Sequence, residues 1–463
     1  MKISFHGAAE GVTGSCHLVQ VGTKKVLIDC GLFQGSRETE EENKNSFGFD
    51  PSEIDYLLLT HAHLDHCGRI PLLAKRGFTG EIITTLATQE LARVVMLDSA
   101  HLNEEEVRRK NRKLQRMRKP NKLLEPLYST EDALYALDFF GRRASYNKFI
   151  EVAKGIRATF IDAGHILGSA CVFLELEEEG NKRTVLFSGD LGSNGRAILR
   201  DPAKPPHADV VVMETTYGDR PHKELEPSIE ELFEAINDTV SRGGNIIIPT
   251  FALERAQELL YYLHEGWKEK RLPMGLQVFL DSPMAISATT IFGRHPECYD
   301  EETKKLFADG HDPFEFPSLH FTHDASESMA LNNIHSGALI LAGSGMCTGG
   351  RVRHHLKKNL WRKECSVIFV GYAAKGTLAR RIVDGAKTVM IFGEEIAVNS
   401  KIYTIGGFSA HAGQSELLAW HQATNKPRTT YLVHGEIESM QTFAGLLSDT
   451  EVRIAKRDEE YEL

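Results

Sequence analysis

Short apolar runs that end in polar or glycine-rich turns recur along the whole chain, and this pattern limits the folds open to it. Runs such as KKVLIDCG, DYLLLTHAH, TVLFSGDLG and NIIIPTFA are rich in Val, Ile and Leu and have the length of buried strands. Several are followed by helical patterns, for example ALERAQELLYYLHEGWKE after NIIIPTF. Strand, loop and helix in alternation predict an α/β fold built in layers.

The size and composition of the chain favour two globular domains. Its 463 residues exceed what one hydrophobic core usually organises, and 41% hydrophobic with 25% charged residues is an ordinary globular composition. The start, MKISFHGAAEG, does not resemble a signal peptide, and no apolar run has the length of a bilayer. Seven cysteines are scattered without a CxxC pair, which is typical of a reduced compartment. We therefore expect a cytoplasmic protein that does not bind a membrane.

The segment THAHLDHCG, residues 60–68, places three histidines and one aspartate in six consecutive positions. His61 and His63 fall on a turn after a strand, and Asp65 and His66 begin the next element. One short loop cannot aim four groups at one ion, but it can aim them at two ions about 3.5–4 Å apart. Imidazole and carboxylate without thiolate suit a catalytic zinc site better than a structural one.

Two adjacent ions need more ligands than this loop contains, and three candidates lie at other strand ends. They are His165 in DAGHILGS, Asp190 in FSGDLGS and His434 in YLVHGE. Open α/β sheets build their sites at the carboxyl ends of strands, and the glycines beside Asp190 would permit a close approach of the backbone. Taken singly, each of these residues could equally be an ordinary surface or hydrogen-bonded side chain.

HAHLDH, with LIDCG before it and the single His and Asp positions after it, resembles the metallo-β-lactamase superfamily of dinuclear hydrolases. The resemblance implies an αββα sandwich with the metals at one sheet edge. It implies two Zn²⁺ ions per chain, the first held by His61, His63 and His165 and the second by Asp65, His66 and His434, with Asp190 between them. Asp29 would support the ligand loop by hydrogen bonds, as such orienting carboxylates do.

ETTYG (214–218), FSAHA (408–412) and VHGE (433–436) resemble the motifs of the β-CASP branch, the nucleases of RNA processing and DNA repair. DSPMA, SGMCTGGR and GYAAKGTLARR are similar to the subgroup related to the eukaryotic pre-mRNA 3′-end cleavage and polyadenylation endonuclease. The resemblance implies an α/β β-CASP domain inserted late in the sandwich. We expect residues 1–215 and 398–463 to form the metallo-β-lactamase domain and residues 216–397 the insert.

The resemblance also implies an activity. RNA-directed members carry histidine at the position of His434, whereas DNA-directed members usually carry valine, so RNA is favoured as substrate. His411 would donate a proton to the leaving oxygen, and the carboxylate of Glu214 would hold His411 in place and favour its protonated form. Asp29 and Asp65 complete the expected catalytic group. The products would carry a 5′-phosphate and a 3′-hydroxyl, and internal cleavage is favoured.

Three alternatives stay open at this point. The chain could be a DNA-directed β-CASP nuclease or a small-molecule metallo-hydrolase of the same superfamily, and a non-catalytic RNA-binding scaffold is a third reading. The large insert and the Glu214, His411 and His434 motifs argue against the small-molecule hydrolase. A scaffold would require broken ligand positions, and none of the expected positions is lost.

Two further segments are candidate RNA contacts, with single-stranded RNA as the favoured partner; the resemblance also allows a homodimer. SGMCTGGR follows an apolar run, precedes a helical pattern and could cradle a phosphate, although a tight turn needs the same small residues. Its candidate phosphate ligands, with one lysine beyond the loop, are Ser344, Gly345, Gly349, Gly350, Arg351 and Lys375. The basic run 108–122 contains no acidic residue and could attract RNA, although such runs are commonly solvated helix faces.

Overall fold

The computed structural model describes residues 1–117, 123–371, 373–374 and 376–463, apart from the side chain of Arg37. The chain divides into two compact units: a first unit of residues 1–194, 201–221 and 411–463, and a second unit of residues 195–200 and 222–410. The boundaries thus fall at 221/222 and 410/411, where we expected 215/216 and 397/398. In the second unit, β19 (Lys401–Ile405) pairs in parallel with β16 (Ser366–Val370).

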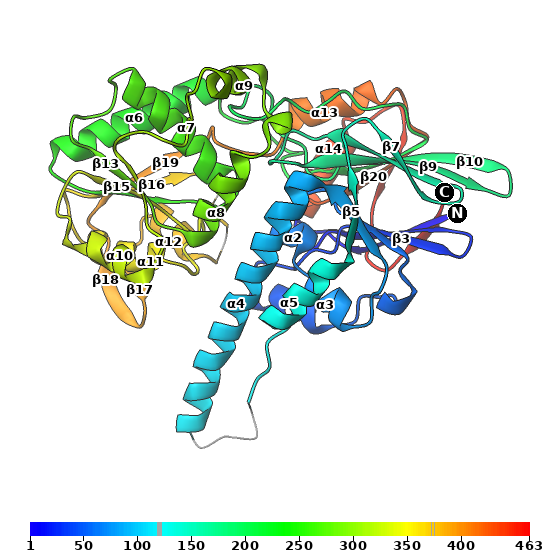
Figure 1. The fold of residues 1–463 in the computed structure, drawn as a ribbon, viewed down its shortest axis with the longest axis horizontal. Helices are drawn as coiled ribbons and strands as arrows, with labels where there is room; N and C mark the ends of the chain where they lie inside the picture. The colour runs from blue at the N-terminus through cyan, green and yellow to red at the C-terminus, as the bar shows by residue number, and fades with distance from the viewer. Residues whose placement is uncertain (118–122, 372, 375) are drawn as a thin grey trace. The chain divides into compact units, whose positions relative to one another are not determined.

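Two seven-stranded sheets form the centre of the first unit (Figure 1). The first sheet has the order β22-β1-β2-β3-β4-β5-β6 and the second β21-β20-β11-β10-β9-β8-β7. The strands of the first sheet are β1 (Lys2–Gly7), β2 (Cys16–Val21), β3 (Lys24–Ile28), β4 (Tyr56–Leu58), β5 (Glu81–Thr85), β6 (Phe140–Ala144) and β22 (Glu460–Glu462). Those of the second are β7 (Phe149–Ala153), β8 (Ile156–Asp162), β9 (Ala170–Glu178), β10 (Asn181–Phe187), β11 (Val210–Glu214), β20 (Thr429–Val433) and β21 (Glu451–Ile454).

Alternating side chains of the second sheet separate its two faces. Val210 and Val212 belong to a buried cluster that also contains residues of the first sheet, whereas Val211 lies in a cluster with residues of α13 (Gln414–Ala423) and α14 (Ile437–Ala444). This is the period of two that a strand covered on both faces shows. The core therefore lies between the two sheets, with α13 and α14 outside the second one.

The remaining helices of the first unit lie along the other side of the sandwich (Figure 1). They are α1 (Arg37–Glu41), α2 (Leu64–Cys67), α3 (Ile70–Lys75), α4 (Leu86–Arg116) and α5 (Thr130–Ala136). Helix, sheet, sheet and helix in succession confirm the αββα prediction. The seven cysteines of the chain are buried and unpaired, as their scattered spacing predicts.

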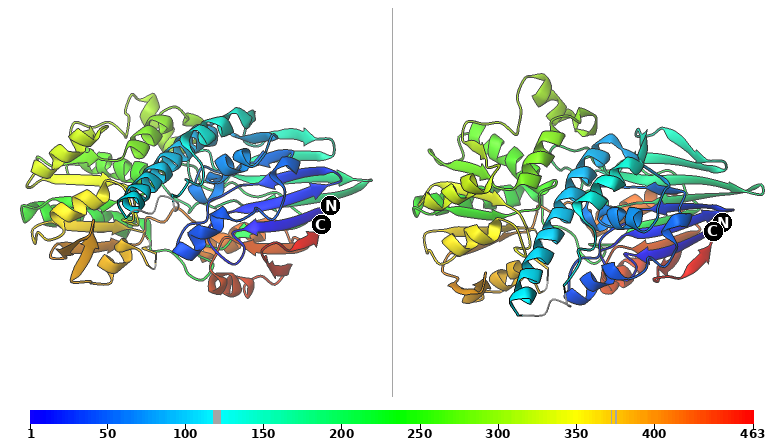
Figure 2. Two further views of the ribbon diagram at one scale, coloured as in Figure 1. Left: turned by 90° about the horizontal axis from the view of Figure 1, so that it is seen from below. Right: turned by 60° about the horizontal axis from the view of Figure 1, so that its bottom comes forward.

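The longest helix, α4, belongs to the first unit, and its second half extends beyond the two sheets (Figure 2). Its buried residues end at Ala100, and the residues that follow are exposed or half-buried. Within the described part of the chain, no helix combines the length and the apolar character that a membrane span needs.

The second unit is built on one parallel sheet with the order β14-β13-β15-β12-β16-β19. Besides β16 and β19, its strands are β12 (Ile246–Pro249), β13 (Gln277–Leu280), β14 (Leu319–Phe321) and β15 (Ala338–Ala342), and a hairpin is formed by β17 (Thr388–Ile391) and β18 (Glu394–Ala397). Its helices are α6 (Leu225–Ser241), α7 (Arg255–Lys268), α8 (Pro283–Phe292), α9 (Glu301–Ala308), α10 (Ala325–Ala330), α11 (Val352–Asn359) and α12 (Leu378–Val383). Strands of continuous Ile, Val and Leu are buried on both faces, as in other parallel sheets. The inserted α/β domain is therefore confirmed.

Candidate metal centre

The HAHLDH loop lies at the end of β4 and is tied to neighbouring segments through its backbone. The Ser15 amide donates to the Asp65 carbonyl, and the Cys30 amide donates to the His66 carbonyl, each over 2.8 Å. A Cβ atom on Gly31 would lie 1.5 Å from the Asp65 carbonyl oxygen. Glycine is thus required where the LIDCG turn passes the loop, and the turn holds the loop in one conformation.

Asp29 lies beneath this loop and accepts hydrogen bonds from it. Its carboxylate accepts from the Thr60 amide (2.8 Å) and hydroxyl (2.9 Å), and lies 2.7 Å from His66 Nδ1. Asp29 is buried and has a φ of 61°, in the left-handed region that residues other than glycine seldom adopt. The contact with Nδ1 orients His66 so that its Nε2 is free to face the other ligands. Thr60, which sequence analysis did not identify, completes this support.

A first cluster of four ligand atoms is formed by His61 Nε2, His63 Nδ1, His165 Nε2 and Asp190 Oδ2. His63 Nδ1 lies 3.2 Å from His61 Nε2 and 3.1 Å from His165 Nε2. Asp190 Oδ2 lies 3.4 Å from His61 Nε2 and 3.6 Å from His165 Nε2. Four atoms about 2.0–2.1 Å from one tetrahedral ion stand roughly 3.3–3.4 Å apart. The spacing of this cluster therefore fits a single tetrahedral metal ion.

A second cluster contains Asp65, His66 and His434. The two Nε2 atoms of His66 and His434 are 3.2 Å apart, and Asp65 Oδ2 lies 3.5 Å from His434 Nε2. Asp190 Oδ1 lies 3.3 Å from His66 Nε2 and is buried, yet no described residue donates a hydrogen bond to it. A buried carboxylate oxygen without a donor is costly unless a cation is bound to it. Asp190 thus faces the first cluster with one oxygen and the second with the other, which is what a metal-bridging carboxylate requires.

Close backbone contacts bring the distant ligands together. A Cβ atom on Gly192 would lie 1.9 Å from the Gly164 carbonyl oxygen, so glycine lets the loop after Asp190 pass the loop that carries His165. This is the close approach that the glycines beside Asp190 predict. His434 has a φ of 50°, and its Nδ1 lies 3.1 Å from the hydroxyl of Thr216. Thr216 was missed by sequence analysis, although it belongs to the ETTYG motif.

Burial sets the protonation of the first cluster. It lowers the pKa values of His61, His63 and His165, that of His63 to about 3, because an imidazolium loses its hydration there. These rings are therefore neutral at pH 7. Neutral imidazole is the form that binds a metal ion.

His411 and Glu214 form a separate pair beside the first cluster. His411 Nδ1 lies 3.2 Å from both carboxylate oxygens of Glu214, which is fully buried and accepts from the Leu191 amide over 2.6 Å. The His411 ring lies 4.5 Å from that of His165, centroid to centroid. Burial opposes the imidazolium, but the charge of Glu214 and its hydrogen bond outweigh this and raise the pKa of His411 to about 9. His411 is therefore a protonated group next to the candidate metal ligands.

The glycine-rich loop belongs to the second unit, where it joins β15 to α11. A Cβ atom on Gly350 would lie 2.2 Å from the Gly343 carbonyl oxygen, and the φ of Gly350 is 71°. Ser344 is half-buried and lies 3.4 Å from the Gly349 amide, which donates to its hydroxyl. The loop is thus a tight turn in which Gly350 leaves no room for a side chain, and its binding of an RNA phosphate stays a prediction.

Arg351 is engaged inside the second unit. It donates to Asp281 over 2.7 Å and to the carbonyls of Thr322 and His323 over 2.9 and 3.0 Å. Asp281 is fully buried. These contacts give Arg351 a structural position that sequence analysis did not predict, and Lys375 lies outside the described residues.

Three family models match the chain. The model described as the metallo-β-lactamase superfamily matches residues 9–249, the one described as the Beta-Casp domain residues 256–382, and the one described as a Zn-dependent metallo-hydrolase RNA specificity domain residues 395–455. The chain is 40% identical over 449 residues to Ribonuclease TTHA0252 of Thermus thermophilus, covering 97% of this chain and 96% of that protein.

It is also 30% identical over 468 residues to the transcription termination factor FttA of Methanocaldococcus jannaschii, covering 99% of this chain and 70% of that protein. A solved structure of a protein of unknown function from Enterococcus faecalis V583 has the same fold, with a TM-score of 0.56 at 14% identity over 100% of this chain and 99% of that one. The metallo-β-lactamase superfamily comprises divalent-metal hydrolases, and the two His and Asp clusters supply the ligands that such a metal needs. The chain belongs to the metallo-β-lactamase superfamily and carries the inserted Beta-Casp domain of its β-CASP branch.

Proposed function

We propose that this protein is a zinc-dependent ribonuclease that holds two zinc ions and hydrolyses RNA phosphodiester bonds internally. The observation that carries the proposal is Asp190, whose two oxygens face two separate clusters of metal-ligating atoms. RNA as substrate is supported by the ribonuclease named above and by the domain described as an RNA specificity domain. Histidine at position 434, as in RNA-directed members of the branch, is further support.

In this proposal each cluster holds one ion. His61, His63 and His165 hold the first, Asp65, His66 and His434 hold the second, and Asp190 contacts both. Bound zinc would supply a water of lowered pKa and neutralise charge on the phosphoryl oxygens. Asp29 and Thr216 contribute by orienting His66 and His434 through their Nδ1 atoms.

His411 is proposed to donate the proton that the leaving oxygen needs. Its raised pKa keeps it protonated at neutral pH, and the buried carboxylate of Glu214 fixes its ring through Nδ1. If the leaving group is the 3′-oxygen of the ribose, the products carry a 3′-hydroxyl and a 5′-phosphate. Single-stranded RNA is the proposed substrate.

Two other candidate functions differ from the proposed one in the substrate that is cleaved. DNA cleavage would need the same centre, and a small-molecule hydrolase would need no contact with a polynucleotide. The inserted domain and the motifs around Glu214, His411 and His434 argue against the small-molecule hydrolase. DNA cleavage is therefore the second candidate.

The test compares single-stranded RNA with DNA of the same sequence, each labelled separately at either end. Zinc-loaded protein is incubated with each polymer, and Asp65→Ala, which removes one ligand of the second cluster, is the control. We expect RNA cleavage with 5′-phosphate ends, internal fragments from both labels, and no cleavage by the control. Cleavage of DNA alone would replace the RNA proposal, and full zinc content without cleavage of either polymer would contradict both.

A further inference from the structure

The second half of α4 presents a row of cations on one face. Residues 107–117 contain six Lys or Arg side chains and no carboxylate, in a chain whose net charge is -10. Four of the six follow the spacing i, i+3, i+4 and i+7, which places them within roughly 100° of arc on a helix with 3.6 residues per turn. We name these four the cation stripe: Arg109, Arg112, Lys113 and Arg116.

The opposite face of this helical segment is covered. Asn111 donates to the Leu124 carbonyl and accepts from the Leu124 amide, both over 2.8 Å, and Asn111 and Leu114 are half-buried. Around the helix axis, each of these two residues lies roughly 100° from the nearer edge of the cation stripe and roughly 160° from the other edge. The segment around Leu124 thus contacts the helix on the side opposite the stripe, and the stripe faces solvent.

The stripe is not neutralised by neighbouring carboxylates. The two basic residues outside it are paired, Arg108 with Glu104 over 3.3 Å and Lys110 with Glu106 over 2.8 Å. In contrast, no ion pair is found for the four stripe residues within the described part of the chain, and all four are exposed. Like charges three or four residues apart destabilise a helix. The four charges of the stripe therefore repel one another, and a bound anion would relieve that repulsion.

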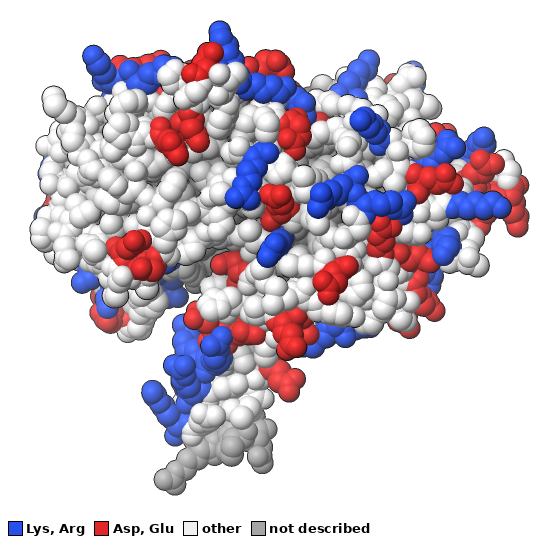
Figure 3. All heavy atoms as spheres, in the orientation of Figure 1, with Lys and Arg blue, Asp and Glu red and all other residues white. Residues whose placement is uncertain are grey.

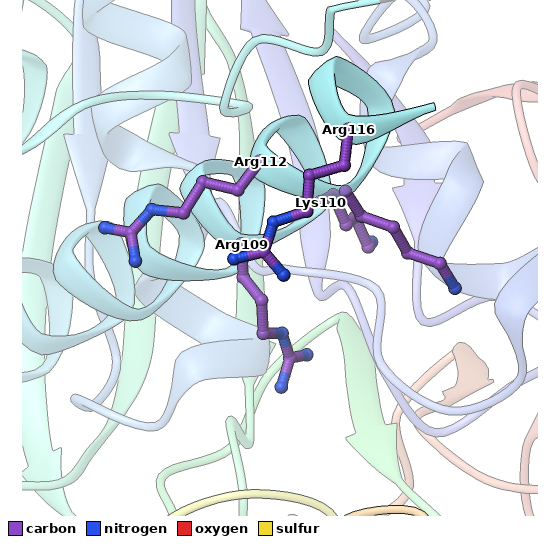
Figure 4. A pocket seen from close by; sticks show the side chains of 5 residues that line it. Arg109, Lys110, Arg112 and Arg116 are labelled. Atoms are coloured by element: carbon purple, nitrogen blue, oxygen red, sulfur yellow. The ribbon is translucent and has the colours of Figure 1, made fainter. Parts of the chain in front are cut away.

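The side chains of the stripe and that of Lys110 line one open, shallow space along the helix. Figure 4 shows Arg109, Lys110, Arg112 and Arg116 projecting from neighbouring turns of the helix. Figure 3 shows Lys and Arg gathered along this part of α4, with few acidic side chains among them. Four exposed cations without a described carboxylate partner match a polyanion, whose charges recur along its backbone.

The same helix begins next to the metal centre. The hydroxyls of Thr85 and Thr88 donate to the Gly168 carbonyl over 2.7 and 2.8 Å, in the loop that carries His165. The stripe lies 23 to 30 residues further along α4 than Leu86, which corresponds to about 35–45 Å of helix at 1.5 Å per residue. A stacked RNA strand covers that distance with about 10–13 nucleotides at 3.4 Å each.

We propose that the cation stripe binds the phosphate backbone of single-stranded RNA at a distance from the nucleotides held at the metal centre. The proposal rests on the ribonuclease function proposed above and assigns the stripe to substrate recognition without base specificity. Three of its four residues are arginines, whose planar guanidinium groups match phosphate geometry in a bidentate manner. Binding should therefore depend on RNA length and on salt, and not on sequence.

The first test is RNA binding in a salt series. The stripe variant combines Arg109→Gln, Arg112→Gln, Lys113→Gln and Arg116→Gln. A matched control removes four exposed or partly exposed cations from the β7–β10 region of the same unit by Lys148→Gln, Lys154→Gln, Arg157→Gln and Lys182→Gln. Both are made in full-length, metal-loaded His411→Ala protein, and the affinity for a fluorescent single-stranded RNA of about 30 nucleotides, which is about 100 Å of stacked strand, is followed by anisotropy.

Counterion release sets the expected size of the effect. Each phosphate contact on a single strand contributes about 0.7 to the slope of log affinity against log salt, so losing four contacts makes the slope shallower by about 2.8. When the salt rises from about 50 to 200 mM, the fall in affinity should be about 50-fold smaller for the stripe variant than for its parent. The control variant should keep the slope of the parent. An unchanged slope in the stripe variant, or an equal change in the control, would overturn the proposal.

The second test uses substrate length and separates this proposal from that of the ribonuclease activity. With His411 intact, the stripe variant should cleave an RNA of about four nucleotides, roughly 14 Å long, at the rate of the unmodified protein, because such an RNA does not reach the stripe. It should cleave the long RNA less efficiently, through a higher KM. Equal loss on both substrates would overturn the proposal. If the unmodified protein cleaves neither RNA, the ribonuclease proposal fails while the salt series still decides whether the stripe binds RNA.

Discussion

Replacing Glu214 by Gln should convert the proton donor from a charged to a neutral imidazole at neutral pH. His411 Nδ1 lies 3.2 Å from both carboxylate oxygens of the buried Glu214, and the pKa of His411 is raised to about 9. A proton donor with a raised pKa is active below that pKa and loses activity as the pH rises through it. Activity that depends on His411 should therefore persist across the neutral range and decline near pH 9.

Glu214→Gln removes the charge and keeps the size of the side chain. Burial, the largest influence on the pKa of His411, then opposes only the weaker charges of Asp190 and Asp65, so this pKa should fall towards its ordinary value of about 6.5. At that value the protonated fraction at about pH 7.5 drops from about 97% to about 9%, so cleavage should slow about tenfold and recover as the pH approaches 6. Each additional contribution from burial would enlarge the loss.

The assay is the pH dependence of kcat/KM at saturating zinc, with metal content measured in parallel. Glu151→Gln, which removes an exposed carboxylate on β7 of the same unit, is the matched control and should keep the profile of the unmodified protein. An alkaline limb that stays in place in Glu214→Gln would refute the reasoning. In that case either His411 does not donate the proton or Glu214 does not raise its pKa.

The remaining predictions concern the metal ligands and the side chains around them. His434→Ala should lose one ion and most activity, because the second cluster is left with two of its own ligands; full zinc content by atomic absorption would contradict this. Asp29→Asn should weaken zinc binding by about 10–100-fold in a chelator competition, since it disturbs the residue that orients His66. Thr216→Val should weaken the second ion in the same assay through the lost contact with His434 Nδ1, and equal affinity in this variant would remove Thr216 from the site. His411→Ala should keep both ions but slow cleavage by about 10²–10⁴-fold, whereas loss of zinc would make His411 a ligand.

The local pattern was sufficient for the fold class and for part of the site. Apolar strands that alternate with amphipathic helices predicted α/β layers, because burial on one or two faces leaves its period in the chain. The density of ligands in HAHLDH predicted a metal site, because neither packing nor turn geometry selects three histidines and an aspartate in six positions. The motifs around Glu214, His411 and His434 added the β-CASP branch, which the family models confirm.

The contacts between distant segments could not be predicted from such patterns. His66 and His434 are 368 residues apart and have Nε2 atoms 3.2 Å apart, and only the packing of β20 into the second sheet brings them together. The bond of Thr216 to His434 depends on the same packing. Arg351 was a candidate phosphate ligand, and its contact with buried Asp281 was visible only once β13 and α11 were placed.

The sequence by itself thus determined which chemistry the chain can perform, and the tertiary structure decided which atoms face each other. Residue type and spacing report on local burial and on the kinds of ligand present. The two oxygens of Asp190 face separate clusters because loops from four strands meet at one edge of the sandwich. The spacing of the cation stripe is a local pattern, whereas the contact of Asn111 with Leu124, thirteen residues along the chain, decided which face of α4 is covered. The arrangement around Asp190 depends on long-range packing, which no local pattern encodes.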